Sequence, residues 1–264
     1  MKKNSIVFLL FLGVLLVHCN EKEVKEKGFR ISESSTSEVD SVNSNGVNES
    51  DKNRKTKSVD LLATANPNVK VIPIFLVNYN EKQKLHFTGS NAFYYNYNDD
   101  LKTKGNSWKS IIPGFEALYG YNLVNIFHFD QQKNEGKNLF EKSVLIKTLY
   151  FPTKELDSLK NKPIKRNYYM VSVYDQDTNK DNYLNIKDLR RFYFFDENGI
   201  NKEAIVPLNY SVIGAFFDET NDFLYIDAKE DVNKDGKINK NETVTLFYLD
   251  LNNPKNKGIV YKNK

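Results

Sequence analysis

The chain has 264 residues, enough for one or two domains with a sizeable core. One cysteine excludes a disulfide framework and a cysteine-rich zinc domain, and 3 histidines argue against a histidine-rich metal site. With 38 Lys and Arg against 34 Asp and Glu, the net charge of +4 is too small to indicate a nucleic-acid partner, while 18 Phe and 16 Tyr favour a β-rich domain.

The first eighteen residues have the organisation of an export signal. Lys2 and Lys3 precede an uninterrupted apolar run from Ile6 to Val17. As a helix this run would be about 18 Å long, which is too short for a bilayer core of about 30 Å. Residues 1–18 are therefore predicted to be a cleaved signal peptide rather than a transmembrane helix.

The end of this run resembles the lipobox of a bacterial lipoprotein. Leu16-Val17-His18-Cys19 ends in the only cysteine of the chain, although His18 stands where a small residue is usual. The resemblance implies that Cys19 carries the acyl chains and anchors the protein in the membrane. Asn20, where an aspartate would favour the inner membrane, implies the outer membrane, on its periplasmic or surface-exposed face. The alternative is an ordinary signal peptide.

The next segment has the composition of a tether. Residues 32–58 are rich in Ser, Asn, Asp, Glu and Lys and contain no aromatic residue. Such a segment cannot bury enough apolar area to offset the loss of chain entropy on folding. We therefore expect residues 19–65 to form a disordered tether, and residues 66–264 to form the folded domain.

The domain is predicted to be all-β and antiparallel. Short runs of Val, Ile, Phe and Tyr alternate with turns of Asn, Asp, Gly and Lys, which is the pattern of strands joined by tight connections. The clearest runs are 69–77, 92–97, 123–129, 143–151, 168–174, 192–195, 212–217, 223–226, 244–249 and 259–261.

The sequence also repeats itself. Shifting residues 169–206 by 54 places Asp177 on Asp231 and the pair Phe195-Asp196 on Leu249-Asp250. A weaker third copy begins at Phe127-His128-Phe129-Asp130.

A unit of strands that ends in an aromatic-Asp turn resembles the blade of a TolB-like β-propeller. The resemblance implies a β-meander of about three propeller-blade-like repeats, either an incomplete or atypical propeller or a sandwich. Pairing of Val69–Val77 with Ile259–Tyr261 would close such a sheet.

Residues 231–242 resemble the EF-hand calcium loop in residue type and spacing. Ca²⁺ takes 6–8 oxygen ligands, and Gly236 at position 6 permits the sharp turn with positive φ. Ile238 at position 8 is expected to anchor the loop in the core. The predicted ligands are Asp231, Asn233, Asp235, the Lys237 carbonyl, Asn239 and Glu242.

Residues 177–188 form a second such loop with two departures. Asn182 replaces the glycine, and the terminal Asp188 is one methylene shorter than a glutamate, which predicts a weaker or more Mg²⁺-tolerant site. The predicted ligands are Asp177, Asn179, Asp181, the Tyr183 carbonyl, Asn185 and Asp188. Asp175 and Glu230 precede the two loops and are expected to add negative field.

The predicted calcium is structural. Strand-like runs flank both loops, whereas a calcium sensor needs helices that reorient to expose an apolar groove, often rich in methionine. Only 2 Met occur in the whole chain. We expect two Ca²⁺ sites, each of which joins two strands; the alternative is that the loops are metal-free polar turns.

Other candidate chemistry is sparse. The aromatic cluster 93–97 and Trp108 are candidates for a protein- or glycan-binding surface, with ordinary core aromatics as the alternative. His86 and His128 are the only histidines after Cys19, and a spatial triad with either would define a hydrolase. The sequence thus predicts a calcium-binding, lipid-anchored envelope protein that acts as a non-catalytic binding or assembly module. A lipid-anchored hydrolase with structural calcium is the alternative.

Overall fold

The computed structural model describes residues 28–31, 56–58, 60–80, 85–88, 93–95, 112–119 and 122–263. Strands and turns make up this part of the chain, with no helix, and every strand pair in it is antiparallel. The prediction of an antiparallel all-β fold is therefore confirmed.

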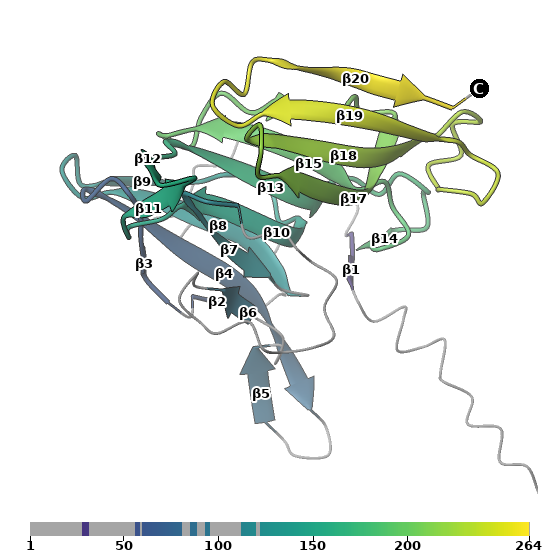
Figure 1. Ribbon diagram of the computed structural model, residues 1–264. Coiled ribbons are helices and arrows are strands. Elements are labelled where there is room, and N and C mark those ends of the chain that lie inside the picture. Colours follow the sequence, from purple (N-terminus) through teal and green to yellow (C-terminus); the bar gives the residue numbers. More distant parts are fainter. Residues whose placement is uncertain are drawn as a thin grey trace, which may run out of the picture.

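Three sheets form the body of the protein, and they lie one above another in Figure 1. The N-terminal sheet consists of β2 (Thr56–Ser58), β3 (Leu62–Ala63), β4 (Val69–Asn80), β5 (Leu85–Thr88), β8 (Leu123–Asp130) and β9 (Glu135–Asn138). The middle sheet consists of β6 (Phe93–Tyr95), β7 (Phe115–Tyr119), β10 (Leu145–Pro152), β13 (Tyr168–Tyr174), β15 (Arg191–Asp196) and β16 (Glu203–Ala204). The C-terminal sheet consists of β17 (Tyr210–Asp218), β18 (Phe223–Glu230), β19 (Val244–Asp250) and β20 (Lys257–Lys262).

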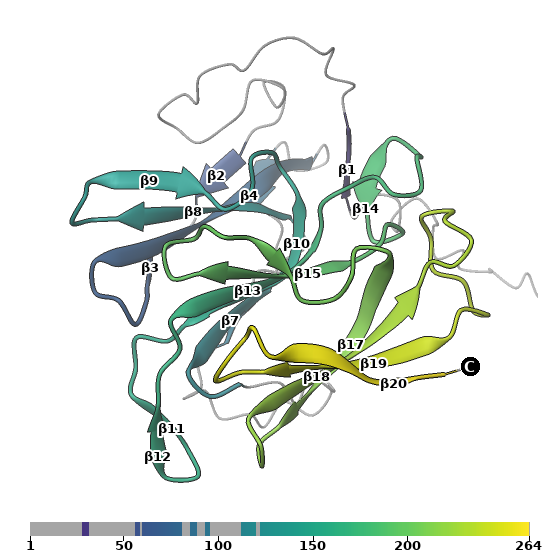
Figure 2. The ribbon, with the colours of Figure 1, turned by 90° about the horizontal axis from the view of Figure 1, so that it is seen from above.

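Two short two-stranded ribbons accompany these sheets in the described part of the chain. β11 (Asp157–Leu159) and β12 (Lys162–Ile164) form a hairpin that projects from the body (Figure 2). β1 (Gly28–Arg30) pairs with β14 (Tyr183–Asn185), which lies far from it in the sequence.

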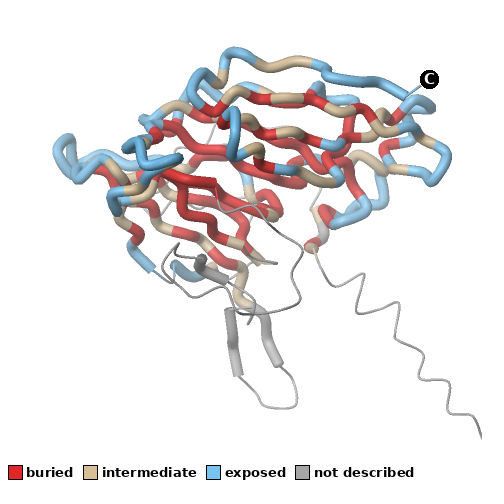
Figure 3. The backbone as a smooth tube through the Cα atoms, viewed as in Figure 1, coloured by how far each residue is buried: buried red, intermediate tan, exposed pale blue. Residues whose placement is uncertain are grey.

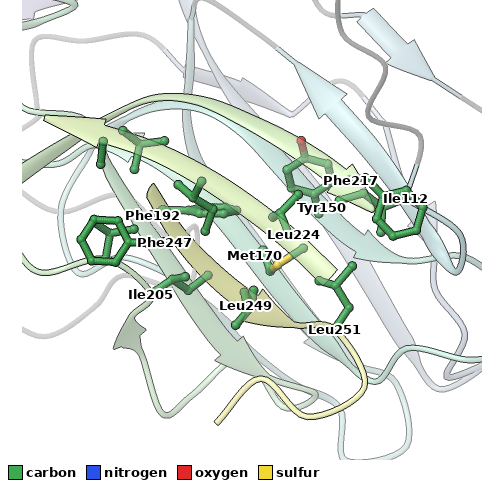
Figure 4. Packing of buried hydrophobic residues seen from close by; sticks show 14 of the residues in the cluster. Ile112, Tyr150, Met170, Phe192, Ile205, Phe217, Leu224, Phe247, Leu249 and Leu251 are labelled. Atoms are coloured by element: carbon green, nitrogen blue, oxygen red, sulfur yellow. The ribbon is translucent and has the colours of Figure 1, made fainter. Parts of the chain in front are cut away.

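The middle sheet is buried on both faces, and β13 shows why. Tyr168 and Met170 point into the core shared with the C-terminal sheet, whereas Tyr169, Val171 and Val173 point into the core shared with the N-terminal sheet. Successive side chains of a strand point to opposite faces, so a strand between two sheets carries apolar residues that face both ways. Figure 3 shows this strand buried along its length, and Figure 4 shows Met170 within the first of the two cores.

The sequence repeat corresponds to a structural repeat. β13, β15 and β16 occupy the same places in the middle sheet as β18, β19 and β20 occupy in the C-terminal sheet. The second strand of each unit, β15 or β19, ends in an aspartate whose carboxylate accepts the N–H two residues further on, from Asn198 to Asp196 and from Asn252 to Asp250. Asp130 at the end of β8 accepts the N–H of Gln132 in the same way, as the weaker third copy predicts.

The predicted pairing of Val69–Val77 with Ile259–Tyr261 is wrong. β4 pairs with β2, β3, β5 and β8 in the N-terminal sheet, and β20 pairs with β19 at the edge of the C-terminal sheet. The middle sheet lies between these two sheets (Figure 1), so neither strand can reach the other. The three units therefore stack as an atypical sandwich, in which none of the sheets closes into a ring.

Within the described part of the range 19–65, which was expected to be a disordered tether, lie the strands β1, β2 and β3. β2 and β3 pair with β4, which moves the start of the folded region to about Thr56, and β1 pairs with β14. Short segments can be ordered in spite of a polar composition when an existing sheet edge supplies their hydrogen-bond partners. The signal peptide and Cys19 lie outside the described residues.

Candidate calcium loops

Both predicted calcium loops connect neighbouring antiparallel strands. Loop 1 (177–188) joins β13 to β15 and contains β14, and loop 2 (231–242) joins β18 to β19. Strands on both sides are what the sequence predicts. The two loops lie on the same side of the molecule in Figures 1 and 2.

Loop 2 is organised by hydrogen bonds from its backbone to its own acidic and amide side chains. The N–H of Asp235 donates to Asp231 Oδ1 at 3.1 Å and to Asn233 Oδ1 at 3.2 Å. The N–H of Gly236 donates to Asp231 Oδ2 at 2.9 Å, and that of Lys237 to Asp235 Oδ1 at 2.9 Å. These bonds turn the oxygen-bearing side chains at positions 1, 3 and 5 toward the inside of the loop.

Loop 1 repeats this pattern position by position. The N–H of Asp181 donates to Asp177 Oδ1 at 3.1 Å and to Asn179 Oδ1 at 3.0 Å. The N–H of Asn182 donates to Asp177 Oδ2 at 2.8 Å, and that of Tyr183 to Asp181 Oδ1 at 2.9 Å. Two segments 54 residues apart therefore fold into one loop geometry.

Backbone angles show the same correspondence. Position 4 has positive φ in both loops, 56° at Lys180 and 58° at Lys234, and so does position 6, 63° at Asn182 and 73° at Gly236. Asparagine adopts the left-handed region more readily than other residues with a side chain. Replacement of the glycine by Asn182 thus leaves the shape of loop 1 intact.

The carboxylate at position 12 distinguishes the two loops. In loop 2, Glu242 Oε2 accepts the N–H of Asn239 at 2.7 Å, while Oε1 is buried without a hydrogen-bond partner. In loop 1, Asp188 Oδ2 accepts the N–H of Asn185 at 2.8 Å, but Oδ1 accepts the N–H of Thr178 at 2.8 Å. The shorter side chain is thus held by backbone donors through both oxygens, and burial raises its pKa.

The depth of the two loops also differs. Leu184 at position 8 of loop 1 is buried in an apolar cluster, whereas Ile238, the expected anchor of loop 2, is only half-buried. Among the ligand candidates, Asp188, Asn185 and Asp231 are buried, and the rest are half-buried or exposed.

The two loops touch each other through Thr178, a residue that the sequence pattern did not identify. Its hydroxyl donates to the carbonyl oxygen of Gly236 at 2.7 Å and accepts the N–H of Leu189 at 2.8 Å. A Cβ at position 236 would collide with the carbonyl of Thr178, so the close approach requires glycine as much as the positive φ does. Position 2 of an EF-hand-type loop supplies no ligand, so the motif specifies no residue type there and does not identify Thr178.

The acidic residues in front of the loops behave differently from each other. Asp175 is buried, and its Oδ2 accepts the hydroxyl of Tyr193 at 2.7 Å. Glu230 accepts a hydrogen bond from Lys262 at 2.6 Å, which lowers its pKa. The charge of Glu230 is therefore offset by Lys262, so it adds less negative field to loop 2 than the sequence suggests.

The residues present are chemically suited to Ca²⁺. Each loop offers carboxylate, amide and backbone carbonyl oxygens, the ligand types that Ca²⁺ prefers, and Glu242 adds a buried oxygen without a partner. Within the described ranges, no group of three or more His, Cys, Asp and Glu side chains is placed so that these alone could hold a metal ion.

Among the remaining candidates, the side chain that the structure describes is that of His128. His128 is buried in β8, where its Nε2 lies 3.1 Å from the carbonyl oxygen of Glu197, and burial lowers its pKa. His86 lies in β5 and Phe93–Tyr95 form β6, but their side chains, like Trp108, lie outside what the structure describes.

The comparisons with known proteins add no assignment. No model of a protein family matches the chain, and no match was found among curated proteins. In the described part of the chain there is no helix with the length and hydropathy needed to span a membrane.

Proposed function

We propose that the chain is a lipid-anchored, calcium-binding envelope protein that acts as a non-catalytic binding or assembly module. The observation that carries the calcium proposal is the agreement between the two loops. Every backbone-to-side-chain hydrogen bond that shapes positions 1 to 7 of loop 2 has its counterpart in loop 1. A polar turn without a metal would not require oxygen-bearing side chains at the same positions of two twelve-residue loops.

Each ion would join two strands of one sheet. Loop 1 would hold Ca²⁺ between β13 and β15, and loop 2 between β18 and β19. The bound ion would offset three carboxylates in each loop, which otherwise repel one another. Glu242 has an oxygen available, whereas both oxygens of Asp188 are engaged, so loop 2 would be the stronger site.

The lipid-anchored hydrolase is the weaker candidate. His128 is buried and hydrogen-bonded to a backbone carbonyl, an environment that does not favour a general base accessible to substrate. The membrane anchor itself is proposed from the position of Cys19 after the apolar run.

The test is thermal unfolding of the protein in calcium and in chelator. Ca²⁺ at about 100 times the dissociation constant of one site should stabilise the folded state by about 2.7 kcal/mol. For a domain of this size that corresponds to a rise in Tm of roughly 5–10 °C per site. The double variant Asp177→Ala plus Asp231→Ala should lose the rise, and Asp231→Ala alone should remove more of it than Asp177→Ala alone.

The matched control is Asp196→Ala plus Asp250→Ala. These aspartates also accept backbone N–H groups in turns, but they lie outside the loops. The control should lower Tm by the same amount in calcium and in chelator. A melting curve of the unmodified protein that does not respond to calcium would refute the proposal.

A further inference from the structure

The N-terminal strand β1 lies against loop 1 and pairs with β14. Gly28, Phe29 and Arg30 pair with Asn185, Leu184 and Tyr183, and the N–H of Ile31 donates to the carbonyl oxygen of Asn182 at 2.9 Å. β14 is therefore both positions 7–9 of the calcium loop and the sheet edge on which β1 lies.

Apolar contacts fix β1 in this place. Phe29 is buried in a cluster formed with residues of β8, β10, β13 and β14, and Ile31 packs against the same cluster. The cluster comprises Phe29, Val124, Leu145, Tyr174 and Leu184. At Gly28, an added Cβ would collide with the backbone carbonyl of Leu184 and with Asn185, so only glycine permits this approach.

The register between β1 and β14 leaves the Tyr183 carbonyl, a predicted calcium ligand, outside the hydrogen bonds of this strand pair. In an antiparallel pair, hydrogen-bonded residue pairs alternate with pairs that are not hydrogen-bonded. Because Ile31 bonds to Asn182, the next bonded pair is Phe29 with Leu184, and the backbone groups of Tyr183 face away from β1. The N–H of Tyr183 indeed donates to Asp181 Oδ1 inside the loop. The Tyr183 carbonyl, the predicted ligand at position 7, is thus on the loop side of the strand.

We propose that docking of β1 on loop 1 and calcium binding in loop 1 favour each other, an inference that rests on the calcium function proposed above. Both events require the same three residues of β14 to be ordered. If β1 docks first, β14 is already ordered when Ca²⁺ binds, and if Ca²⁺ binds first, β14 is already ordered when β1 docks. The second event therefore costs less conformational entropy, and the coupling free energy is the same in both directions. β1 pairs with β14 of loop 1, and no described strand lies across position 8 of loop 2, so the direct coupling concerns loop 1.

The coupling would control how far the domain stands from its anchor. With β1 docked, eight residues, 20–27, separate Cys19 from the domain, a span of at most about 30 Å. With β1 released, residues 20–55 precede the first strand of the N-terminal sheet, and the span is several times longer. Calcium would then hold the domain close to the membrane surface.

The first test is amide hydrogen exchange at Ile31, whose N–H bonds to loop 1. Calcium should slow exchange at this amide about tenfold or more relative to chelator, in the unmodified protein and in Asp231→Ala, but not in Asp177→Ala. Equal protection of Ile31 in calcium and in chelator, in protein that binds calcium at loop 1, would overturn the coupling and leave the calcium function standing. If calorimetry detects no calcium at either loop, both proposals fail.

The reciprocal test measures calcium affinity in the Asp231→Ala background, where loop 1 alone can bind. Adding Gly28→Ala should weaken this affinity by the same factor by which calcium slows exchange at Ile31. Gly214→Ala is the matched control, because a Cβ at Gly214 meets only the Asp227 side chain, at 3.8 Å. An unchanged affinity in the Gly28→Ala protein would contradict the proposal.

Discussion

A buried ion pair between the middle and C-terminal sheets yields the sharpest stability prediction. Arg166 precedes β13 and Asp222 lies in the turn between β17 and β18, with 2.6 Å between Nη2 and Oδ1. Their side chains are 1% and 6% exposed. Arg166 also donates to the carbonyls of Leu251 at 2.7 Å and Pro113 at 3.1 Å.

The perturbation is Asp222→Asn. Asparagine has nearly the shape of aspartate and tolerates the φ of 58° at this position, so the backbone has no reason to move. The change removes one charge and leaves the Arg166 guanidinium buried without its counter-ion. Loss of one partner of a buried pair costs about 3–5 kcal/mol, a large part of the roughly 5–15 kcal/mol by which domains are stable.

The assay is unfolding in urea of four proteins, the unmodified chain, Asp222→Asn, Arg166→Met and the double variant. The double variant should lose less than the sum of the single losses, because it leaves no unpaired charge. Glu203→Gln serves as the control, since it breaks the exposed ion pair with Lys257 and should cost below about 1 kcal/mol. A loss below 1 kcal/mol for Asp222→Asn would refute the reasoning.

The remaining predictions concern the anchor and the pH dependence of folding. Cys19→Ser should abolish labelling by radioactive palmitate and move the protein from the membrane pellet to the supernatant, whereas an unlabelled parent protein would contradict lipidation. Burial lowers the pKa of His128 below 6.5, so the unfolded chain takes up the proton first as the pH falls. The free energy of unfolding should then decrease below pH 6.5, by at most about 1.4 kcal/mol per pH unit until the lowered pKa is reached. In His128→Leu this decrease in the free energy of unfolding should be absent. Urea unfolding of both proteins between pH 7.5 and 5 measures the free energy. Parallel pH profiles of the two proteins would contradict the assignment of the decrease to His128.

Features set by neighbouring residues were predictable from the sequence. The aspartates that end β8, β15 and β19 accept the N–H of the residue two positions further on, so their turns can be recognised without knowledge of the rest of the fold. The internal geometry of loops 1 and 2 is local in the same sense. The spacing of their acidic and amide residues therefore located both loops, and the apolar runs beside them located the flanking strands.

Features that depend on residues distant in the sequence were missed or mistaken. The apolar run of β4 predicts a strand, but its partner is β8 rather than β20, because a strand edge accepts any partner that the packing of side chains brings to it. β1 was assigned to the tether because three residues carry too little apolar area to predict a strand without knowing that β14 is there. The loop pattern predicted that Ile238 is buried in the core, but it is only half-buried. Its counterpart Leu184 is the one that packs in a buried apolar cluster.

The sequence by itself determined the all-β class, the repeat of 54 residues and the two oxygen-rich loops, because these follow from strand periodicity and from hydrogen bonds within a few residues. Tertiary structure alone decided how the three sheets stack, that Thr178 joins the loops, and that β1 lies on loop 1. These contacts join segments far apart in the chain, and their free energy comes from apolar burial and close backbone approach that one segment cannot reveal without its partner.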